Sequence, residues 1–378
     1  MQGFRSLRQR RHNSASGMSV SGNLEKAVKL LQEMVRRPSF SREESVTADL
    51  LEDWLRANGA VDVRRLHNNV YAVAPGYDPS RPTLMLNSHH DTVRPARGYT
   101  RGPFSADLED GCVFGLGSND AGASVVSLAC TFLALQHDAA LPVNLLLALT
   151  AAEEVMGELG MRAFLPHLAT EGLAPDMVIV GEPTGMQPAV AERGLVVLDA
   201  EVTGKSGHAA RNEGINAIYR AIEDIERLRG FEAPRCSATL GPVKVNVTII
   251  EAGTQHNVVP DVCRYVVDVR TTDAYTNAET VGLLRDAVKW SVLTPRSTRI
   301  QASVIDASHP LVRAAVAQGR ETFISPTTSD MALMHGIPSL KIGPGLSQRS
   351  HTADEFVRLD EIEEALSLYP AIIKDIRL

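Results

Sequence analysis

The sequence predicts an α/β protein in two domains: a mostly parallel sheet covered by helices, and an inserted α+β domain. Three observations predict this class. The chain has 378 residues, whereas a single hydrophobic core stops growing at about 250 to 300 residues. Short apolar runs alternate with helical patterns in the first half, which is typical of parallel strands joined by helices. Near Ala189 the pattern changes to longer alternating strands, and near Pro295 the first pattern returns.

The first part of the chain alternates between helices and short strands. Apolar residues at helical spacing predict a helix from Leu24 that ends before Pro38. A second helix runs from Arg42 to Asn58, where the following Gly59 favours a left-handed stop. Apolar runs then predict strands at 70–73, 83–87, 143–150 and 177–180, and a helix at 123–135. These elements form the helix-covered sheet.

A second set of elements forms the inserted domain. Alternating patterns predict strands at 194–202, 244–250 and 264–270, with helices near 216–229 and 278–290. The closing part of the chain has a helix near Leu311, a strand at 339–342 and a helix at 361–376. We therefore assign 19–188 and 299–378 to the domain with the helix-covered sheet, and 189–298 to the inserted domain. A basic extension, 1–18, precedes them, and we expect it to be disordered.

The composition excludes several kinds of partner. With 44% hydrophobic and 22% charged residues, the chain resembles folded globular proteins rather than disordered ones. A net charge of -7 gives no basic field for nucleic acid outside the short N-terminal extension. We find no apolar stretch of membrane length and expect no membrane span. Four widely spaced cysteines without a C-x-x-C pair indicate buried, reduced thiols in a cytoplasmic protein.

Acidic residues and histidines gather at five places where strands end or turns begin. Open α/β sheets usually bind their ligands at this edge. The five segments, in chain order, are 87–93, 115–122, 150–154, 180–184 and 350–355. Together they offer histidines and several carboxylates, the nitrogen and oxygen ligands that suit zinc at catalytic sites. We therefore predict a catalytic metal site.

Two of these segments favour cations over other ligands. Segment 115–122 is a glycine-rich turn of the kind that cradles phosphate, but Asp120 occupies it and would repel an anion. A carboxylate in a tight turn suits a bridge between two cations about 3.5 to 4 Å apart. Glu153 and Glu154 are adjacent at a strand end, where like charges repel unless a cation or solvent compensates. Beside a metal, one acid can bind the ion while the other takes a proton from water.

The order of motifs H-x-D, G-x-G-S-x-D-x-x-G, T-x-x-E-E, G-E-P-T and S-H-T-x-D-E resembles the M20 metallopeptidase family. This family includes acetylornithine deacetylases and succinyl-diaminopimelate desuccinylases. The resemblance runs from about residue 22 to the C-terminus. It implies a zinc-peptidase-like catalytic domain, with 189–298 as a ferredoxin-like lid or dimerisation domain, and therefore a homodimer.

The resemblance also implies a set of metal ligands. One ion would be held by His89, Asp120 and Glu182. The other would be held by Asp120, Glu154 and His351, so that Asp120 bridges the two. The cofactors would be two divalent ions, Zn²⁺ in the first place, with Co²⁺ or Mn²⁺ able to replace it because carboxylate oxygens accept all three. In this family a cis peptide bond usually follows the bridging aspartate.

Further roles are implied outside the ligand set. Glu153 would be the general base that takes a proton from water and later passes it to the leaving amine. Asp91 would orient the first metal-binding histidine. His208, in the motif G-x-x-G-H-x-A, would reach a partner subunit's site and stabilise the tetrahedral oxyanion. Asn257 and Arg270 would bind a substrate carboxylate, the arginine through its bidentate fork.

We therefore expect a metal-dependent hydrolase of linear amides that removes an acyl group from a small amino acid. The glutamate in G-E-P-T is similar to the deacetylase and desuccinylase side of the family, and the chain length and the segment 328–330 resemble acetylornithine deacetylases. The first expectation is N-acetylornithine or N-acylcitrulline deacylation in arginine biosynthesis. Succinyl-diaminopimelate desuccinylase, aminoacylase and dipeptidase activities are alternatives. A non-catalytic metal-binding relative is another, although the presence of Glu153 argues against it.

Overall fold

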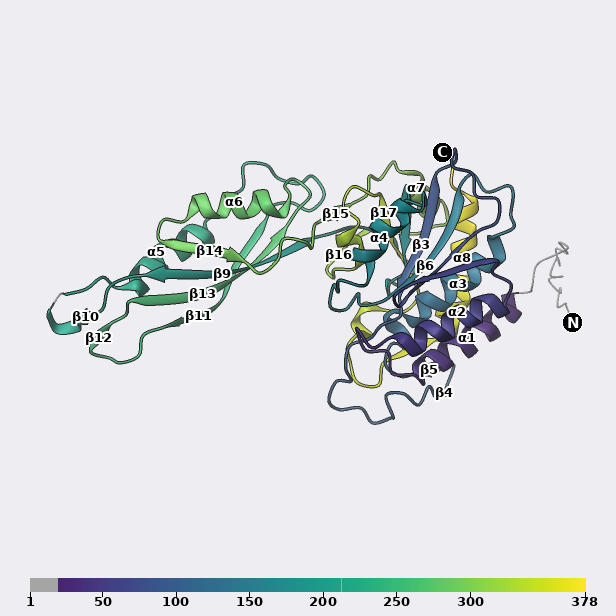
Figure 1. Ribbon diagram of the computed structural model, residues 1–378, viewed down its shortest axis with the longest axis horizontal. Helices are drawn as coiled ribbons and strands as arrows, with labels where there is room; N and C mark the ends of the chain where they lie inside the picture. Colours follow the sequence, from purple (N-terminus) through teal and green to yellow (C-terminus); the bar gives the residue numbers. More distant parts are fainter. Residues whose placement is uncertain (1–19, 212) are drawn as a thin grey trace, which may run out of the picture.

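The computed structural model describes residues 20–211 and 213–378, which form two units that lie side by side (Figure 1). The large unit contains both ends of the described chain. The smaller unit, residues 194–295, extends away from it as an elongated arm. The basic extension predicted at 1–18 lies outside the described residues.

A nine-stranded mixed sheet forms the centre of the large unit. Its middle strands are parallel, in the order β6 (Asn144–Thr150), β3 (Thr83–His89), β7 (Met177–Val180) and β17 (Ser339–Lys341). The edges are β1 (Asp62–Leu66) and β2 (Asn69–Val73) on one side, and β8 (Ala189–Glu192), β15 (Ser303–Val304) and β16 (Phe323–Ser325) on the other. The predicted α/β class is confirmed, and most of the antiparallel edge pairing is added by strands that the sequence did not predict. A small sheet of β18 (Phe356–Arg358), β5 (Cys112–Phe114) and β4 (Leu108–Glu109) completes this unit.

Helices cover both faces of the central sheet because its inner strands are apolar on both sides. Leu84 and Leu86 of β3 belong to one hydrophobic cluster, whereas Met85 between them belongs to another. The first cluster includes α1 (Val20–Val35), α2 (Ser45–Ala57), α3 (Ala123–Leu135), α7 (Pro310–Ala317) and α8 (Leu359–Lys374). On the opposite face, α4 (Met161–Thr170) packs against the second cluster. The sheet is thus enclosed between helical layers.

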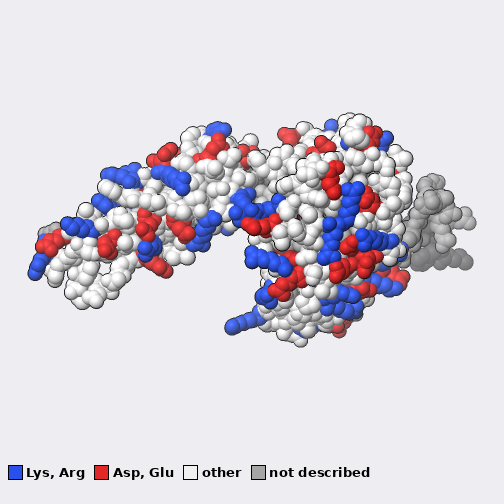
Figure 2. Space-filling model, viewed as in Figure 1, with Lys and Arg blue, Asp and Glu red and all other residues white. Residues whose placement is uncertain are grey.

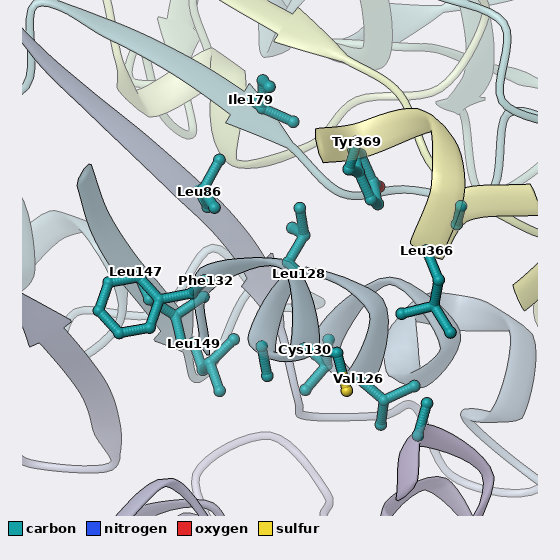
Figure 3. Packing of buried hydrophobic residues seen from close by; sticks show 14 of the residues in the cluster. Leu86, Val126, Leu128, Cys130, Phe132, Leu147, Leu149, Ile179, Leu366 and Tyr369 are labelled. Atoms are coloured by element: carbon teal, nitrogen blue, oxygen red, sulfur yellow. The ribbon is translucent and has the colours of Figure 1, made fainter. Parts of the chain in front are cut away.

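Phe132 of α3 belongs to the first cluster, and its ring lies close to Leu147 and Leu149 of β6 (Figure 3). Its side chain is fully buried. We expect Phe132→Ala to lower the free energy of unfolding by about 3 to 5 kcal/mol, because the change removes a buried ring and leaves a cavity. Urea unfolding followed by circular dichroism measures this. The matched control Val61→Ala, at an exposed position, should change the value by less than about 0.5 kcal/mol; equal effects would contradict the packing.

The arm is built around a separate hydrophobic cluster. Its antiparallel sheet has the order β11 (Lys244–Ala252), β13 (Val262–Thr271), β9 (Gly194–Thr203) and β14 (Ser291–Pro295). Helices α5 (Ala217–Arg229) and α6 (Asn277–Ala287) contribute to the cluster with the buried residues of β9 and β13. At the end of the arm far from the large unit, β10 (Gly207–His208) pairs with β12 (Val258–Val259) (Figure 1).

The structure differs from the predicted elements mainly at their ends. α2 begins at Ser45 rather than at Arg42, because Arg42 has a positive φ of 76°, which α-helical residues do not adopt. α6 ends at Ala287, since Val288 is extended and leads toward β14. β8 falls inside the range 189–298 predicted for the inserted domain, but it pairs with β15 and β17 of the central sheet.

The expectation that no apolar stretch reaches membrane length was wrong for one segment. Ser118–Leu135 is long and apolar enough, but 83% of it is buried inside the protein. It is apolar on all sides because α3 lies between the sheet and other helices. The cysteines also differ in part from the prediction, since all four are free but Cys236 is exposed and Cys112 is half-buried.

Charged side chains of both signs are interspersed over the two units. On the face drawn in Figure 2, lysines and arginines lie among aspartates and glutamates rather than in one continuous stripe. A protein that binds a phosphate backbone presents clustered positive charge. The face drawn in Figure 2 does not present such a cluster of positive charge, and the net charge of the chain is -7.

Candidate metal centre and active site

The acidic and histidine side chains come together because parallel strands end at the same edge of the sheet. His89 is the last residue of β3 and lies opposite Thr150, the last residue of β6. Glu153 and Glu154 follow β6 within four residues, and Glu182 follows β7 within two. The strand order β6, β3, β7 therefore places these side chains next to each other.

The structure forms the first predicted ligand group from His89, Asp120 and Glu182, whose ligand atoms all lie within 4.8 Å of one another. His89 Nε2 is 3.2 Å from Asp120 Oδ1 and 3.8 Å from Glu182 Oε1. One imidazole nitrogen with two carboxylates is a donor set that suits a catalytic zinc ion, which keeps a further position open. The residues therefore fit a divalent cation.

The second predicted group consists of Asp120, Glu154 and His351, and it meets the same 4.8 Å limit. His351 Nε2 lies 3.0 Å from Glu154 Oε1 and 3.6 Å from Asp120 Oδ2. Asp120 thus turns one carboxylate oxygen to each group. This is the arrangement that a bridging ligand between two cations requires.

A carboxylate distant in sequence holds the turn that carries Asp120. Glu355 accepts hydrogen bonds from the backbone N–H groups of Gly117, Asn119 and Asp120, each at 2.9 Å. Gly117 has a positive φ of 76°, and a Cβ there would lie 2.5 Å from the Thr92 side chain. The peptide bond between Asp120 and Ala121 is cis, as the family resemblance implies. We gave Glu355 no role from sequence, although it closes the motif S-H-T-x-D-E.

Asp91 connects the histidine of the first group to the acidic pair. Its carboxylate lies 3.5 Å from His89 Nδ1 and accepts hydrogen bonds from the backbone N–H groups of Glu153 and Glu154 at 3.0 and 3.3 Å. Ser41 Oγ donates a further hydrogen bond at 2.7 Å. Besides the expected contact with His89, Asp91 therefore fixes the turn after β6. His89 Nδ1 also lies within hydrogen-bond distance, 3.0 Å, of the backbone oxygen of Asp91. A histidine held in this way keeps its other nitrogen directed at a metal.

The crowded carboxylates shift the acid–base properties of the site. Burial, and then the charge of Glu182, raise the pKa of Glu153 well above its usual range, although His89 opposes this. Burial likewise raises the pKa of Glu182 to about 8, against the opposing effect of His89. The hydrogen bond from His351 to Glu154 raises the pKa of His351 to about 9. Burial and, after it, the neighbouring carboxylates thus disfavour the charged forms of Glu153 and Glu182, and bound cations would favour those charged forms.

A pocket of about 290 Å³ opens beside these side chains. Every residue of the two ligand groups except His89 lines this pocket, and so does Glu153. Segment 325–328, which begins with the last residue of β16, and Lys341 at the end of β17 also line the pocket. The predicted base and the predicted ligands therefore share one small pocket.

The residues predicted in the inserted domain do not join this site within one chain. His208 lies in β10 and Asn257 directly precedes β12, at the end of the arm far from the large unit (Figure 1). Arg270 lies at the other end of the arm sheet, opposite Leu195, and its guanidinium is held by Asp268 at 2.8 Å. Among the described residues, these three are not in the two ligand groups or in the lining of the pocket beside them.

Residues 85–375 match the model of peptidase family M20/M25/M40. The chain belongs to this family. The M20 chain is 28% identical over 375 residues to succinyl-diaminopimelate desuccinylase of Cereibacter sphaeroides, which covers 92% of this chain and 98% of the relative. It is also 28% identical over 373 residues to the protein of that name from Dinoroseobacter shibae, with the same coverage of both chains.

Solved structures agree with this assignment. An aminopeptidase from Bacillus cereus superposes with a TM-score of 0.75 at 22% identity, covering 93% of this M20 chain and 98% of the other. A dinuclear metal-binding M20 peptidase from Bacillus subtilis gives a TM-score of 0.69 at 18% identity, covering 94% and 98%. Both show the same fold. The family match and the relatives make this M20 protein a metal-dependent amidohydrolase, as predicted.

Proposed function

We propose that this enzyme hydrolyses the amide bond of an N-acylated amino acid with the help of two divalent cations, Zn²⁺ in the first place. One observation supports this above the others: Asp120 is shared by two potential ligand groups, and Glu153 lines the same pocket. A water-activating acid beside a bridged pair of metal sites is the arrangement that metal-assisted hydrolysis needs.

In the proposed mechanism, Glu153 moves the proton. Two bound cations would polarise the acyl carbonyl and lower the pKa of water. Glu153 takes a proton from the attacking water and passes it to the nitrogen of the leaving amine, so that the C–N bond breaks without a free amide anion. Asp91 keeps His89 and the turn of Glu153 in place through this step, because it contacts both. No covalent acyl-enzyme is required.

Two substrate classes have support. The name of the relatives, succinyl-diaminopimelate desuccinylase, favours an N-succinyl amino acid. The chain length and segment 328–330 favour an N-acyl-ornithine, N-acetylornithine first, or an N-acyl-citrulline, whereas Glu182 in G-E-P-T is compatible with both classes. In both classes the products are a short carboxylic acid and a free amine, so one assay for released amine serves for both.

The experiment is a panel of N-acetyl and N-succinyl derivatives of ornithine, citrulline and diaminopimelate, with two dipeptides, tested on protein loaded with Zn²⁺, Co²⁺ or Mn²⁺. We expect turnover of one acyl class and its loss on chelation. Preferred turnover of the dipeptides would replace the proposal by a peptidase function. Binding of two metals per chain without turnover of any compound would support a non-catalytic relative.

We also propose that two chains form a homodimer through the arm. β11 is an edge strand of the arm sheet, and its Ile249 and Ile250 are each 52% exposed. Exposed apolar edges of this kind are typical of strand pairing between subunits. A dimer would also give His208, at the far end of the arm, a site to act on in the partner. There its imidazole would stabilise the negative oxygen that forms during attack.

If His208 acts in the partner subunit, inactive variants should complement each other. We expect His208→Ala and Glu153→Gln to be nearly inactive separately, and to regain part of the activity when subunits are exchanged, because a mixed dimer has one intact site. Specific activity after mixing, with size-exclusion chromatography coupled to light scattering, measures both points. His256→Ala, an exposed histidine of the same region, is the matched control and should stay active. Absence of recovery in a proven mixed dimer would contradict the role.

A further inference from the structure

A buried ion pair lies at the wall of the catalytic pocket. Its two residues are outside the five motifs and have no role in the proposed mechanism. Lys341 Nζ is 2.9 Å from Glu192 Oε2, and the two side chains are only 2% and 0% exposed. Lys341 ends β17 and Glu192 ends β8, which neighbour each other in the central sheet. Burying two charges is costly unless each finds close partners.

Both charges have such partners. The Lys341 ammonium also donates to Thr327 O at 2.9 Å and to Thr327 Oγ1 at 3.4 Å. With Glu192, these acceptors match the three N–H donors that a lysine has. The Glu192 carboxylate accepts hydrogen bonds from the backbone N–H and the hydroxyl of Ser329, at 3.2 and 2.9 Å. The pair therefore anchors the segment that forms the pocket wall.

The charge balance of the pocket follows from this pairing. Among the described residues that line it, Lys341 is the only lysine or arginine. Its charge is offset by Glu192, and its hydrogen-bond donors are directed to protein acceptors. Beyond the metal ligands and Glu153, the remaining lining consists of small hydroxyl side chains and apolar groups: Pro183, Thr184, Phe323, Ser325, Pro326, Thr327, Thr328, Ser347 and Ser350. This wall offers a terminal carboxylate no free cation.

We propose that the Lys341–Glu192 pair determines acyl selectivity: the pocket receives the acyl group, and because the ammonium is already paired, it accepts a short uncharged acyl such as acetyl rather than one that ends in a carboxylate. Lys341 and Glu192 are specificity-determining residues in this sense, and the inference rests on the function proposed above. A hydroxyl-lined pocket of about 290 Å³ suits a small group. A succinyl carboxylate would lie there unpaired, which disfavours its binding.

The test is to remove the negative charge that pairs with the Lys341 ammonium. Glu192→Gln keeps the size of the side chain but removes its charge, so Lys341 becomes available to a carboxylate. We expect kcat/KM for an N-succinyl amino acid to rise relative to that for the matching N-acetyl amino acid by about tenfold or more, since hydrogen bonds to charged groups are strong. The double variant Glu192→Gln with Lys341→Met has no charge to offer and should not show the shift. A purely structural role would reduce both activities alike.

Wild-type protein provides an independent measurement that needs no variant. We expect N-acetyl substrates to have the higher kcat/KM, and acetate to inhibit at least as well as succinate. The inference is overturned if wild type prefers the N-succinyl compound, or if the selectivity of a folded Glu192→Gln protein is unchanged. Those results would leave the proposed hydrolase function intact. If no acyl amino acid of either class is cleaved, the proposed function fails, and the inference fails with it.

Discussion

Glu153→Gln should lower kcat by about a thousandfold while both metals stay bound. General acid–base catalysis contributes about a hundredfold to ten-thousandfold in enzymes, and here one carboxylate serves both the attack of water and the departure of the amine. Glu153 is not in either ligand group, so the metal content should not change. Steady-state kinetics on the preferred amide, with metal analysis of the same samples, measures both quantities.

A nearby glutamate provides the control for this prediction. Glu158 lies in the same loop but is 83% exposed in its side chain, and Glu158→Gln should keep wild-type kcat. If Glu153→Gln lost its metals together with its activity, Glu153 would be acting as a ligand rather than as a base. If it kept more than about a tenth of the activity, the general-base role would be wrong.

Asp120→Asn should remove both metals and all measurable turnover. The reason is geometric: one Asp120 oxygen lies 3.2 Å from His89 and the other 3.6 Å from His351, so a single substitution affects both ligand groups. Changes beside a metal ligand already cost about tenfold to a hundredfold in affinity, and loss of a shared ligand should cost more. Metal analysis after dialysis, and titration of Zn²⁺ into the stripped protein, give the stoichiometry.

Thermal stability gives a second measurement of the same effect. A ligand that binds only the folded state raises the melting temperature, so Zn²⁺ should stabilise stripped wild type and leave Asp120→Asn unchanged. Glu154→Gln, which touches only the second group, should keep one metal. The control variant Asp107→Asn alters a partly exposed surface residue, and this protein should bind two metal ions. Two tightly bound metals in Asp120→Asn would contradict the bridge.

The candidate site could be found from sequence to the extent that its chemistry follows the ends of strands. His89, Glu153 and Glu182 each stand within a few residues of an apolar run, and parallel strands carry such residues to one edge. The assignment of these residues to two metal sites nevertheless came from the order of five motifs, which resembles that of the M20 family. The structure brings these residues together at one edge of the sheet.

Other parts of the site depend on contacts that no local pattern indicates. Glu355 holds the Asp120 turn across 235 positions of the chain, and Glu192 holds Ser329 across 137 positions. In the sequence Glu192 looks like an ordinary surface charge, because most glutamates are exposed, and Glu355 stands in a motif that does not indicate which segment it contacts. Only the fold shows that both are almost fully buried.

The sequence by itself determined the α/β class, the helices and inner strands, and the family, because periodicity and motif order are local properties of the chain. The tertiary structure decided the antiparallel edges of the sheet, the shared position of Asp120 between two groups, and the neutralised charge at the pocket wall. It also separated His208 from the metal ligands of its own chain. These features depend on which distant segments pack together, and burial then fixes which charges must find partners.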